Sequence, residues 1–183
     1  MASFTQRMIG AARLDAGTYE EVEADRAANG QALAVVLLAA VAAGIGGWAA
    51  GGARGFAAHL LAALFAWVAW ALVIWVVGTR ILPSPQTQSD LGELLRTIGF
   101  ASSPGVLRVF GFVPIVGWIL ELAVWVWMLA AFVVAVRQAL DYTSTGRAIV
   151  VCGIGWLVAL GVAMVTTLAL GVSVGLLGAM MGR

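Results

Sequence analysis

The chain has 183 residues, of which 62% are hydrophobic and only 10% are charged, and its formal net charge is +1. Soluble domains average roughly 45–50% apolar and about 25% charged residues, so this chain is too apolar for a single aqueous core of its size. A disordered chain is excluded too, because disorder requires low hydrophobicity and high charge. An integral membrane protein, with the lipid bilayer as its partner, remains.

The scarce residue types exclude several kinds of chemistry. The chain contains one histidine (His59), one cysteine (Cys152) and no lysine. These residues cannot assemble the usual zinc ligand sets or an intrachain disulfide, and a net charge of +1 provides no basic face for nucleic acid. We find no nucleophile, base and orienting group in a common motif. We therefore expect no catalytic residues, no metal, no cofactor and no nucleic-acid partner.

Charge divides the chain into two parts. Residues 1–30 carry five acids and three arginines, a balance of −2, whereas residues 31–183 carry seven arginines and four acids, a balance of +3. We assign residues 1–30 to a head and residues 31–183 to a transmembrane helical domain. Ser3–Leu14 is amphipathic, which suits either a helix on the membrane surface or a frayed tail.

A second head helix is predicted from local signals. Thr18 and Glu21 have the spacing of a capping box, which predicts a short acidic helix that continues to about Arg26. The Asn29-Gly30 pair predicts the end of that helix.

The first two spans follow directly from the charge-free runs. Ala32–Ala53 contains 22 uncharged residues, enough to cross a hydrocarbon layer roughly 30 Å thick at 1.5 Å per residue. Ala53–His59 then predicts a tight link, Leu60–Gly78 a second span, and Thr79–Asp90, with its two prolines, a loop outside the membrane.

The third apolar stretch is ambiguous. Ile98–Pro114 is interrupted by Ser102-Ser103-Pro104-Gly105 and carries Arg108. It is either a short, proline-broken span or a re-entrant segment covered by its neighbours. Beyond it, the sequence predicts a span at Ile115–Val136, a polar connection at Arg137–Arg147 and a last span at about Ala148–Leu170.

Arginine placement fixes the orientation but not the number of spans. Cytoplasmic segments of membrane proteins are enriched in arginine. With the N-terminus in the cytoplasm, a five-span and a four-span arrangement both place seven arginines inside and three outside. We therefore predict a cytoplasmic head, and at this point four and five spans remain open.

The motif Gly99-Phe-Ala-Ser-Ser-Pro104 is similar to the Gly-Tyr-x-x-x-Pro motif of the Yip family, the Ypt/Rab-interacting membrane proteins, with Phe100 in place of tyrosine. The run from Leu94 to Arg147 and the head resemble the bacterial branch of that family. The resemblance implies a five-helix domain with a cytoplasmic N-terminus in a bacterial inner membrane. The Asp-Leu-Tyr-Gly-Pro motif of eukaryotic members is absent, which argues against binding of a small GTPase.

Glu121 is the most unusual residue of the membrane domain. A charged residue at the centre of a span costs about 2.5–3.5 kcal/mol and usually faces a partner or a cavity. The side chain is either structural, paired with Arg108 or with a neighbouring helix, or functional, as a carboxylate that contacts a proton or substrate. We favour the structural interpretation.

Glycines at helical spacing form a second pattern. Gly171, Gly175, Gly178 and Gly182 recur on one helix face, which predicts close helix packing within the chain or, alternatively, between chains. The chain has eight tryptophans, and four of them, Trp67, Trp70, Trp125 and Trp127, lie well inside spans, where packing explains them. No ligand motif supports a pigment or quinone.

We therefore predict an all-α, polytopic membrane helix bundle with five spans, the third short and broken at Pro104. Its predicted role is non-catalytic: it organises the membrane or binds lipids, other membrane proteins or a second copy of itself. Asp141, Tyr142 and Arg147, joined with the acidic head, are a plausible docking surface. The alternative is a small transporter or channel that uses Glu121 and the break at Pro104.

Overall fold

The structure is a computed structural model that describes residues 2–113, 116–161 and 164; for residues 48–51, 53–55, 58 and 59 it describes the backbone only. The described part is helical and contains no strand. Its helices are α1 (Phe4–Ala12), α2 (Ala16–Ala24), α3 (Ala28–Gly46), α4 (Trp48–Val76), the π-helical turn η1 (Val77–Ile81), α5 (Leu91–Ala101), the 3₁₀ helix η2 (Ser103–Phe112), α6 (Val116–Ala139) and a last helix, Thr145–Gly161.

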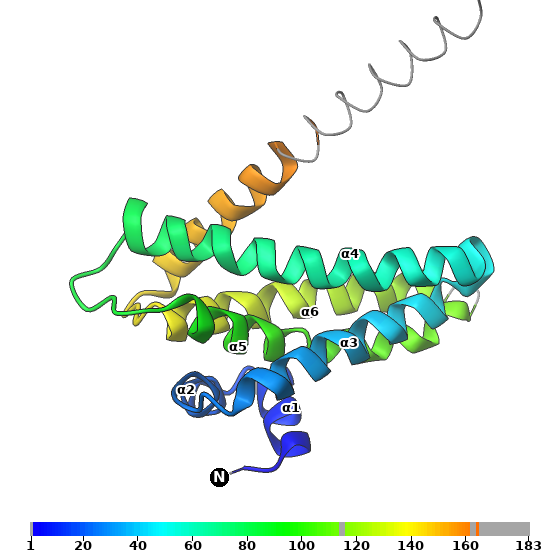
Figure 1. Cartoon of the computed structure of the whole chain (residues 1–183), viewed down its shortest axis with the longest axis horizontal. Coiled ribbons are helices and arrows are strands. Elements are labelled where there is room, and N and C mark those ends of the chain that lie inside the picture. Colours follow the sequence, from blue (N-terminus) through cyan, green and yellow to red (C-terminus); the bar gives the residue numbers. More distant parts are fainter. Residues whose placement is uncertain (1, 114–115, 162–163, 165–183) are drawn as a thin grey trace, which may run out of the picture.

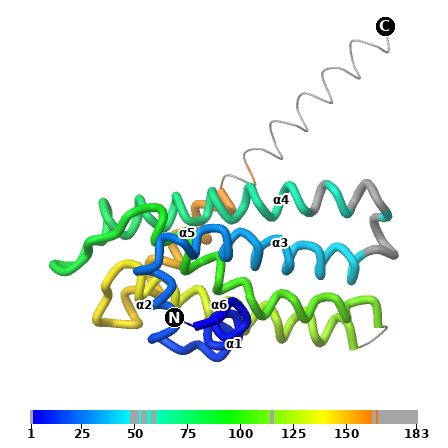
Figure 2. Tube along the Cα trace, turned by 60° about the horizontal axis from the view of Figure 1, so that its bottom comes forward, coloured from blue at the N-terminus to red at the C-terminus, as the bar shows by residue number. Residues whose placement is uncertain are grey.

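Three helical segments of the described part are long and apolar enough to cross a membrane. They are α3, the segment Leu60–Ile81 of α4 and η1, and α6. Figure 1 and Figure 2 show α3, α4 and α6 side by side along the longest axis of the molecule. The all-helical membrane class that composition predicts is therefore confirmed at the level of these three spans.

The ambiguous stretch Ile98–Pro114 forms the end of α5 and η2, and these two helices follow one path along α3. At one end, Arg96 of α5 donates to Asn29 at the start of α3. At the other end, Gly111 of η2 lies against Gly46 at the end of α3. At about 1.5 Å per α-helical residue and about 2.0 Å per 3₁₀ residue, α5 and η2 together extend roughly 36 Å, close to the thickness of a bilayer core.

The connection between the first two long helices lies earlier than the sequence predicts. α3 ends at Gly46, and α4 begins at Trp48, so the turn falls at Gly47. Residues 53–59, which we expected as the link, are part of α4. Within α4 the helix breaks at Gly52, whose φ of 53° is in the left-handed region that glycine adopts without strain. The Gly46-Gly47 pair was the local signal for this turn.

The head is folded against the bundle and not a frayed tail. α1 begins with a capping box between Ser3 and Gln6, and Ala11 on its inner face is fully buried. The ring of Phe4 packs edge-on against Phe100 of α5 at 6.4 Å between centroids. Trp127 of α6 donates its indole N–H to the Ala12 carbonyl at 2.6 Å. Because Trp127 lies midway along α6, α1 lies beside the bundle and not beyond its end (Figure 2).

Two expectations about the head were wrong. Asp15, and not Thr18, caps α2, because its carboxylate accepts the backbone N–H of Thr18 at 3.1 Å. Glu21 is therefore free of a capping role and binds Arg7 instead. The Asn29-Gly30 pair does not end a helix but lies in the first turn of α3, and α2 already ends at Ala24. Capping signals near a helix start are local, whereas Arg7 reaches Glu21 only through tertiary packing.

Candidate functional site

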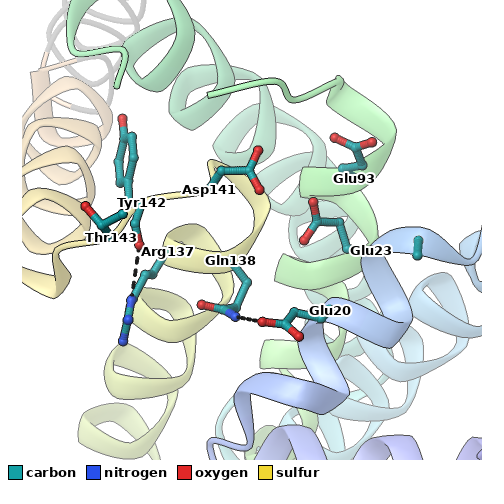
Figure 3. A pocket seen from close by; sticks show the side chains of 9 residues that line it. Glu20, Glu23, Glu93, Arg137, Gln138, Asp141, Tyr142 and Thr143 are labelled. Atoms are coloured by element: carbon teal, nitrogen blue, oxygen red, sulfur yellow. Dashed lines mark hydrogen bonds between the residues drawn. The ribbon is translucent and has the colours of Figure 1, made fainter. Parts of the chain in front are cut away.

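A groove of about 600 Å³ opens where α2 meets the start of α5 and the end of α6. Figure 3 shows the side chains that surround its opening. They are Glu20, Glu23 and Ala24 of α2, Glu93 of α5, Arg137 and Gln138 of α6, and Asp141, Tyr142 and Thr143 after α6. We call this feature the acidic groove.

The position of α2, and with it Glu20 and Glu23, is set by two buried arginines. Arg7 of α1 is 1% exposed and forms ion pairs with Glu21 at 2.9 Å and Asp25 at 2.8 Å. Arg96 of α5 is 3% exposed and donates to the carbonyls of Val22 and Glu23. A buried guanidinium requires such partners, because an unpaired charge is costly to desolvate. The two contacts fix α2 from both sides.

Glu93 and Asp141 are held by local backbone geometry. Asp90 caps α5, and the Asp90 N–H in turn donates to the Glu93 carboxylate at 2.9 Å. Asp141 has a φ of 52°, a left-handed conformation that ends α6. Its carboxylate accepts the N–H of Gln88 at 3.3 Å.

The loop between η1 and α5 is joined firmly to this region. The Tyr142 hydroxyl donates to the carbonyls of Gly78 at 3.2 Å and Leu82 at 2.8 Å. Thr87 donates to the Leu140 carbonyl at 2.9 Å. The buried phenol of Tyr142 has a raised pKa because of desolvation. The polar connection that the sequence predicts after α6 is therefore hydrogen-bonded to η1 and to the loop that follows it.

The acidic groove is lined by four carboxylates and one arginine, Arg137, so acidic groups outnumber basic ones. None of Glu20, Glu23, Glu93 and Asp141 forms an ion pair within the described residues. Arg137 binds the Tyr142 carbonyl and the Thr145 hydroxyl instead. Glu20 accepts a hydrogen bond from Gln138 at 2.7 Å, as Figure 3 shows. The groove is therefore suited to a cationic group.

Glu23 is the most perturbed acid of the groove. Its pKa is raised to about 7, chiefly by burial and then by the neighbouring charges of Asp141 and Glu93. Its carboxylate accepts no hydrogen bond from the described residues. Repulsion among neighbouring carboxylates favours proton uptake or the binding of an external cation. No described group of three His, Cys, Asp or Glu side chains is arranged to bind a metal ion.

The motif residues Gly99, Phe100 and Pro104 lie in packing contacts. A Cβ on Gly99 would lie 2.8 Å from the Cβ of Ala32, so only glycine lets α5 approach α3 so closely. Phe100 is fully buried beside Phe4, and Pro104 begins the 3₁₀ winding of η2. Their role as functional residues stays a prediction, while their contacts join α5 to α3 and to the head.

The structure brings Arg108 and Glu121 together. Arg108 Nη2 of η2 lies 3.1 Å from Glu121 Oε1 of α6. The Arg108 side chain is 18% exposed and that of Glu121 46% exposed, so the pair extends from the bundle interior to its outer surface. This is the contact that the structural interpretation of Glu121 expected.

The remaining sequence predictions have mixed outcomes. The glycines Gly171, Gly175, Gly178 and Gly182 lie outside the described residues, as does the side chain of His59. Asp141 and Tyr142 do line a common groove with the acidic head. Arg147 lies apart from it, over the ring of Tyr142 at 5.7 Å. Sequence reasoning did not single out Glu93, whose only local signal was its capping position.

Comparison with known proteins identifies the family. The Yip1 domain model matches residues 15–179, which is nearly the whole chain. No significant match to a curated protein or to a solved structure was found. The matched range includes α2, every apolar helix described above and the motif Gly99-Phe-Ala-Ser-Ser-Pro104. The chain is therefore a membrane protein of the Yip1 domain family.

Proposed function

We propose that this protein is a non-catalytic organiser of the membrane that binds other membrane proteins, and that the acidic groove binds a basic segment of such a partner. The observation that carries the proposal is the group of four carboxylates around one opening of about 600 Å³, without an ion pair among the described residues. Surfaces with one sign of charge increase the association rate of partners with the opposite charge.

The proposal includes five spans, a cytoplasmic head and a place in a bacterial inner membrane. The excess of arginine on the inner side supports the orientation. The joint length of α5 and η2, together with their path along α3, supports a third crossing.

The test is purification of the full chain from native membranes in a mild detergent. We expect a partner at fixed stoichiometry that is lost when Glu23→Gln and Asp141→Asn are combined. Asp15→Asn is the matched control, because it also removes a carboxylate but lies outside the groove and keeps a good helix cap. A lone chain, or a complex equally retained by both variants, would contradict the proposal.

A second candidate function is a small transporter. The observation that favours it is the 3₁₀ segment η2, a broken helix whose Arg108 pairs with Glu121 of α6. Broken helices near the middle of the membrane are a feature of transporters. This function requires that Glu121→Gln abolish flux of a solute into liposomes while folding stays intact. Retained assembly without any flux in the wild type favours the organiser.

A further inference from the structure

The apolar outer surface of the bundle has two different heights. On α4 and η1, large exposed apolar side chains continue from Leu61 to Ile81. On α6 they begin at Val116 and stop at Leu129, although the helix continues to Ala139. At about 1.5 Å per residue, the first series extends over roughly 30 Å and the second over only roughly 20 Å. The apolar surface is therefore about a third shorter on the side of α6.

The head covers the remainder of α6. The Trp127 indole N–H donates to the Ala12 carbonyl at 2.6 Å, and the Gln138 amide donates to Glu20 at 2.7 Å. Of the α6 residues between these two contacts, only Leu129 is a large exposed apolar residue. Figure 2 shows α1 against the middle of the bundle and not at its end. The head therefore takes the place that lipid would hold beside this part of α6.

α1 lies at the height of a lipid-facing part of α4. The ring of Trp156 is 5.5 Å from that of Trp70 on α4 and 5.2 Å from that of Trp125 on α6, so these two residues have similar heights. Both helices run in the same direction along the bundle (Figure 1). Two residues further along each helix, Leu72 is exposed on α4 and Trp127 contacts α1. A lipid-facing residue and the head thus lie at one height on different sides of the bundle.

The outer face of α1 is too polar for hydrocarbon. Thr5 and Gln6, and Arg13 at the end of the helix, are exposed, and Ile9 is the one large apolar side chain among them. Arg13 forms no ion pair with the described residues. A charge in hydrocarbon is costly, whereas an arginine on an amphipathic helix interacts favourably with lipid head groups. The surface of the bilayer must therefore reach α1.

We propose that phospholipid head groups lie against the outer face of α1, so that the bilayer is locally thinner beside α6 than beside α4. A bilayer becomes thinner where the apolar surface of a protein is shorter than the hydrocarbon core. Arg13 is placed to meet a lipid phosphate. The proposal requires that α4 and α6 cross the membrane, but it depends neither on the acidic groove nor on the side of the membrane on which the head lies.

Reactivity of single cysteines in liposomes tests this. The full-length protein, with the buried Cys152 replaced (Cys152→Ala), is reconstituted into vesicles of phosphatidylcholine and phosphatidylglycerol. A membrane-impermeant maleimide is then supplied on both sides of the bilayer. Ile9→Cys and Leu72→Cys are the matched pair, because the two positions are 47% and 45% exposed.

A thiol reacts as its thiolate, which does not form in hydrocarbon, so Ile9→Cys should react roughly tenfold faster than Leu72→Cys or more. The two should react equally in a denaturing detergent. Leu122→Cys, exposed on the apolar part of α6, should be as slow as Leu72→Cys in the vesicles. A bifunctional maleimide that joins Ala12→Cys to Trp127→Cys in the same vesicles checks that the head stays docked.

Three results would overturn the proposal. If Ile9→Cys is as slow as Leu72→Cys, α1 lies in hydrocarbon; if Leu72→Cys is as fast as Ile9→Cys, this end of the bundle stands in water on both sides. If the crosslink does not form, the head leaves the bundle. Gel filtration checks folding, and Val68→Cys, also 45% exposed, replaces Leu72→Cys if that variant fails to fold. Loss of a partner in the groove variants would leave all these labelling rates unchanged, so the two proposals fail separately.

Discussion

The acidic groove and the Arg108–Glu121 pair differ in whether their carboxylates form ion pairs. In the groove, four carboxylates lie near a single arginine, Arg137, and none of the four forms an ion pair within the described residues. Between η2 and α6, one carboxylate has its own arginine at 3.1 Å. Water screens and solvates charge at the end of the bundle, whereas lipid does neither. A charge in the apolar part must therefore be paired in order to fold, while unpaired charge in the groove remains available to bind.

Removal of one member of the intramembrane pair should have the largest effect. Arg108→Leu leaves Glu121 without its counter-charge, and we expect a loss of about 3 kcal/mol in the free energy of unfolding. The double variant Arg108→Leu/Glu121→Leu should recover most of that loss, because no charge remains unpaired. Unfolding of the purified variants in a denaturing detergent measures both. Equal destabilisation of the single and double variants would show that the charges do not depend on each other.

Arg7 tests whether pairing matters equally in the head. Arg7→Met keeps much of the volume but removes both ion pairs and the bond to Gln31, and we expect a loss of about 2 kcal/mol in docking of the head. Limited proteolysis between α1 and α3 reports the docking. Arg26→Met, at an exposed position, is the control. If Arg7→Met resists proteolysis as well as the wild type, the packing of Phe4 and Ala11 is sufficient to dock the head.

The same contact predicts acid sensitivity. Hydrogen bonds from Arg7 lower the pKa of Glu21 and Asp25 below their ordinary values of 4.5 and 3.8. A lowered pKa contributes stability above the ordinary value, and this stability is lost as the pH falls through the lowered one. Docking of the wild-type head should therefore weaken below about pH 4, and Arg7→Met should lose this dependence.

Gly99 tests the contact of α5 with α3, on which both charged regions depend. Gly99→Ala places a methyl group 2.8 Å from Ala32 Cβ and 3.2 Å from its Cα, and we expect a loss of about 1–2 kcal/mol. Ala32→Gly in the same chain should restore part of it. Gly30→Ala is the control, since nothing lies within 4 Å of its added Cβ. A Gly99→Ala protein as stable as the wild type would show that α5 adjusts its position at little cost.

The sequence predicted the helices of this protein better than the contacts between them. Hydropathy predicted both ends of α6 and the C-terminal end of α4 to within a few residues, because lipid-facing helices are apolar throughout. The turn at Gly47, which the sequence analysis placed at residues 53–59, lies at the Gly46-Gly47 pair inside the first uncharged run. For Glu121, the sequence analysis offered Arg108 as one of two structural partners, because charges in a span need partners, and the structure shows that pair.

The groove was only partly foreseeable. Asp141, Tyr142 and the acidic head were expected to form one surface, since all were polar segments on the same predicted side. Glu93 was seen only as a helix-start residue, and its place beside Glu23 depends on Arg96 binding the end of α2.

The smallest expected effect concerns Glu23. Burial and neighbouring carboxylates raise its pKa from 4.5 to about 7, so the folded protein holds a proton that the unfolded chain releases. The stabilisation from that proton is complete below the ordinary value and is lost as the pH rises through about 7.

Glu23→Gln mimics the protonated acid, so it should match the wild type at about pH 4 and be more stable at about pH 8. Thermal unfolding at both pH values measures this, and Asp15→Asn, a carboxylate outside the groove, should show no such gain. Glu23→Gln also removes one of the four carboxylates that we propose bind a basic partner. A variant that gains stability at alkaline pH while it loses the partner would show that the groove keeps an unfavourable charge for binding, in contrast to the pair in the membrane. If Glu23→Gln alters neither the stability at alkaline pH nor the binding of the partner, Glu23 has no role in the function of the groove.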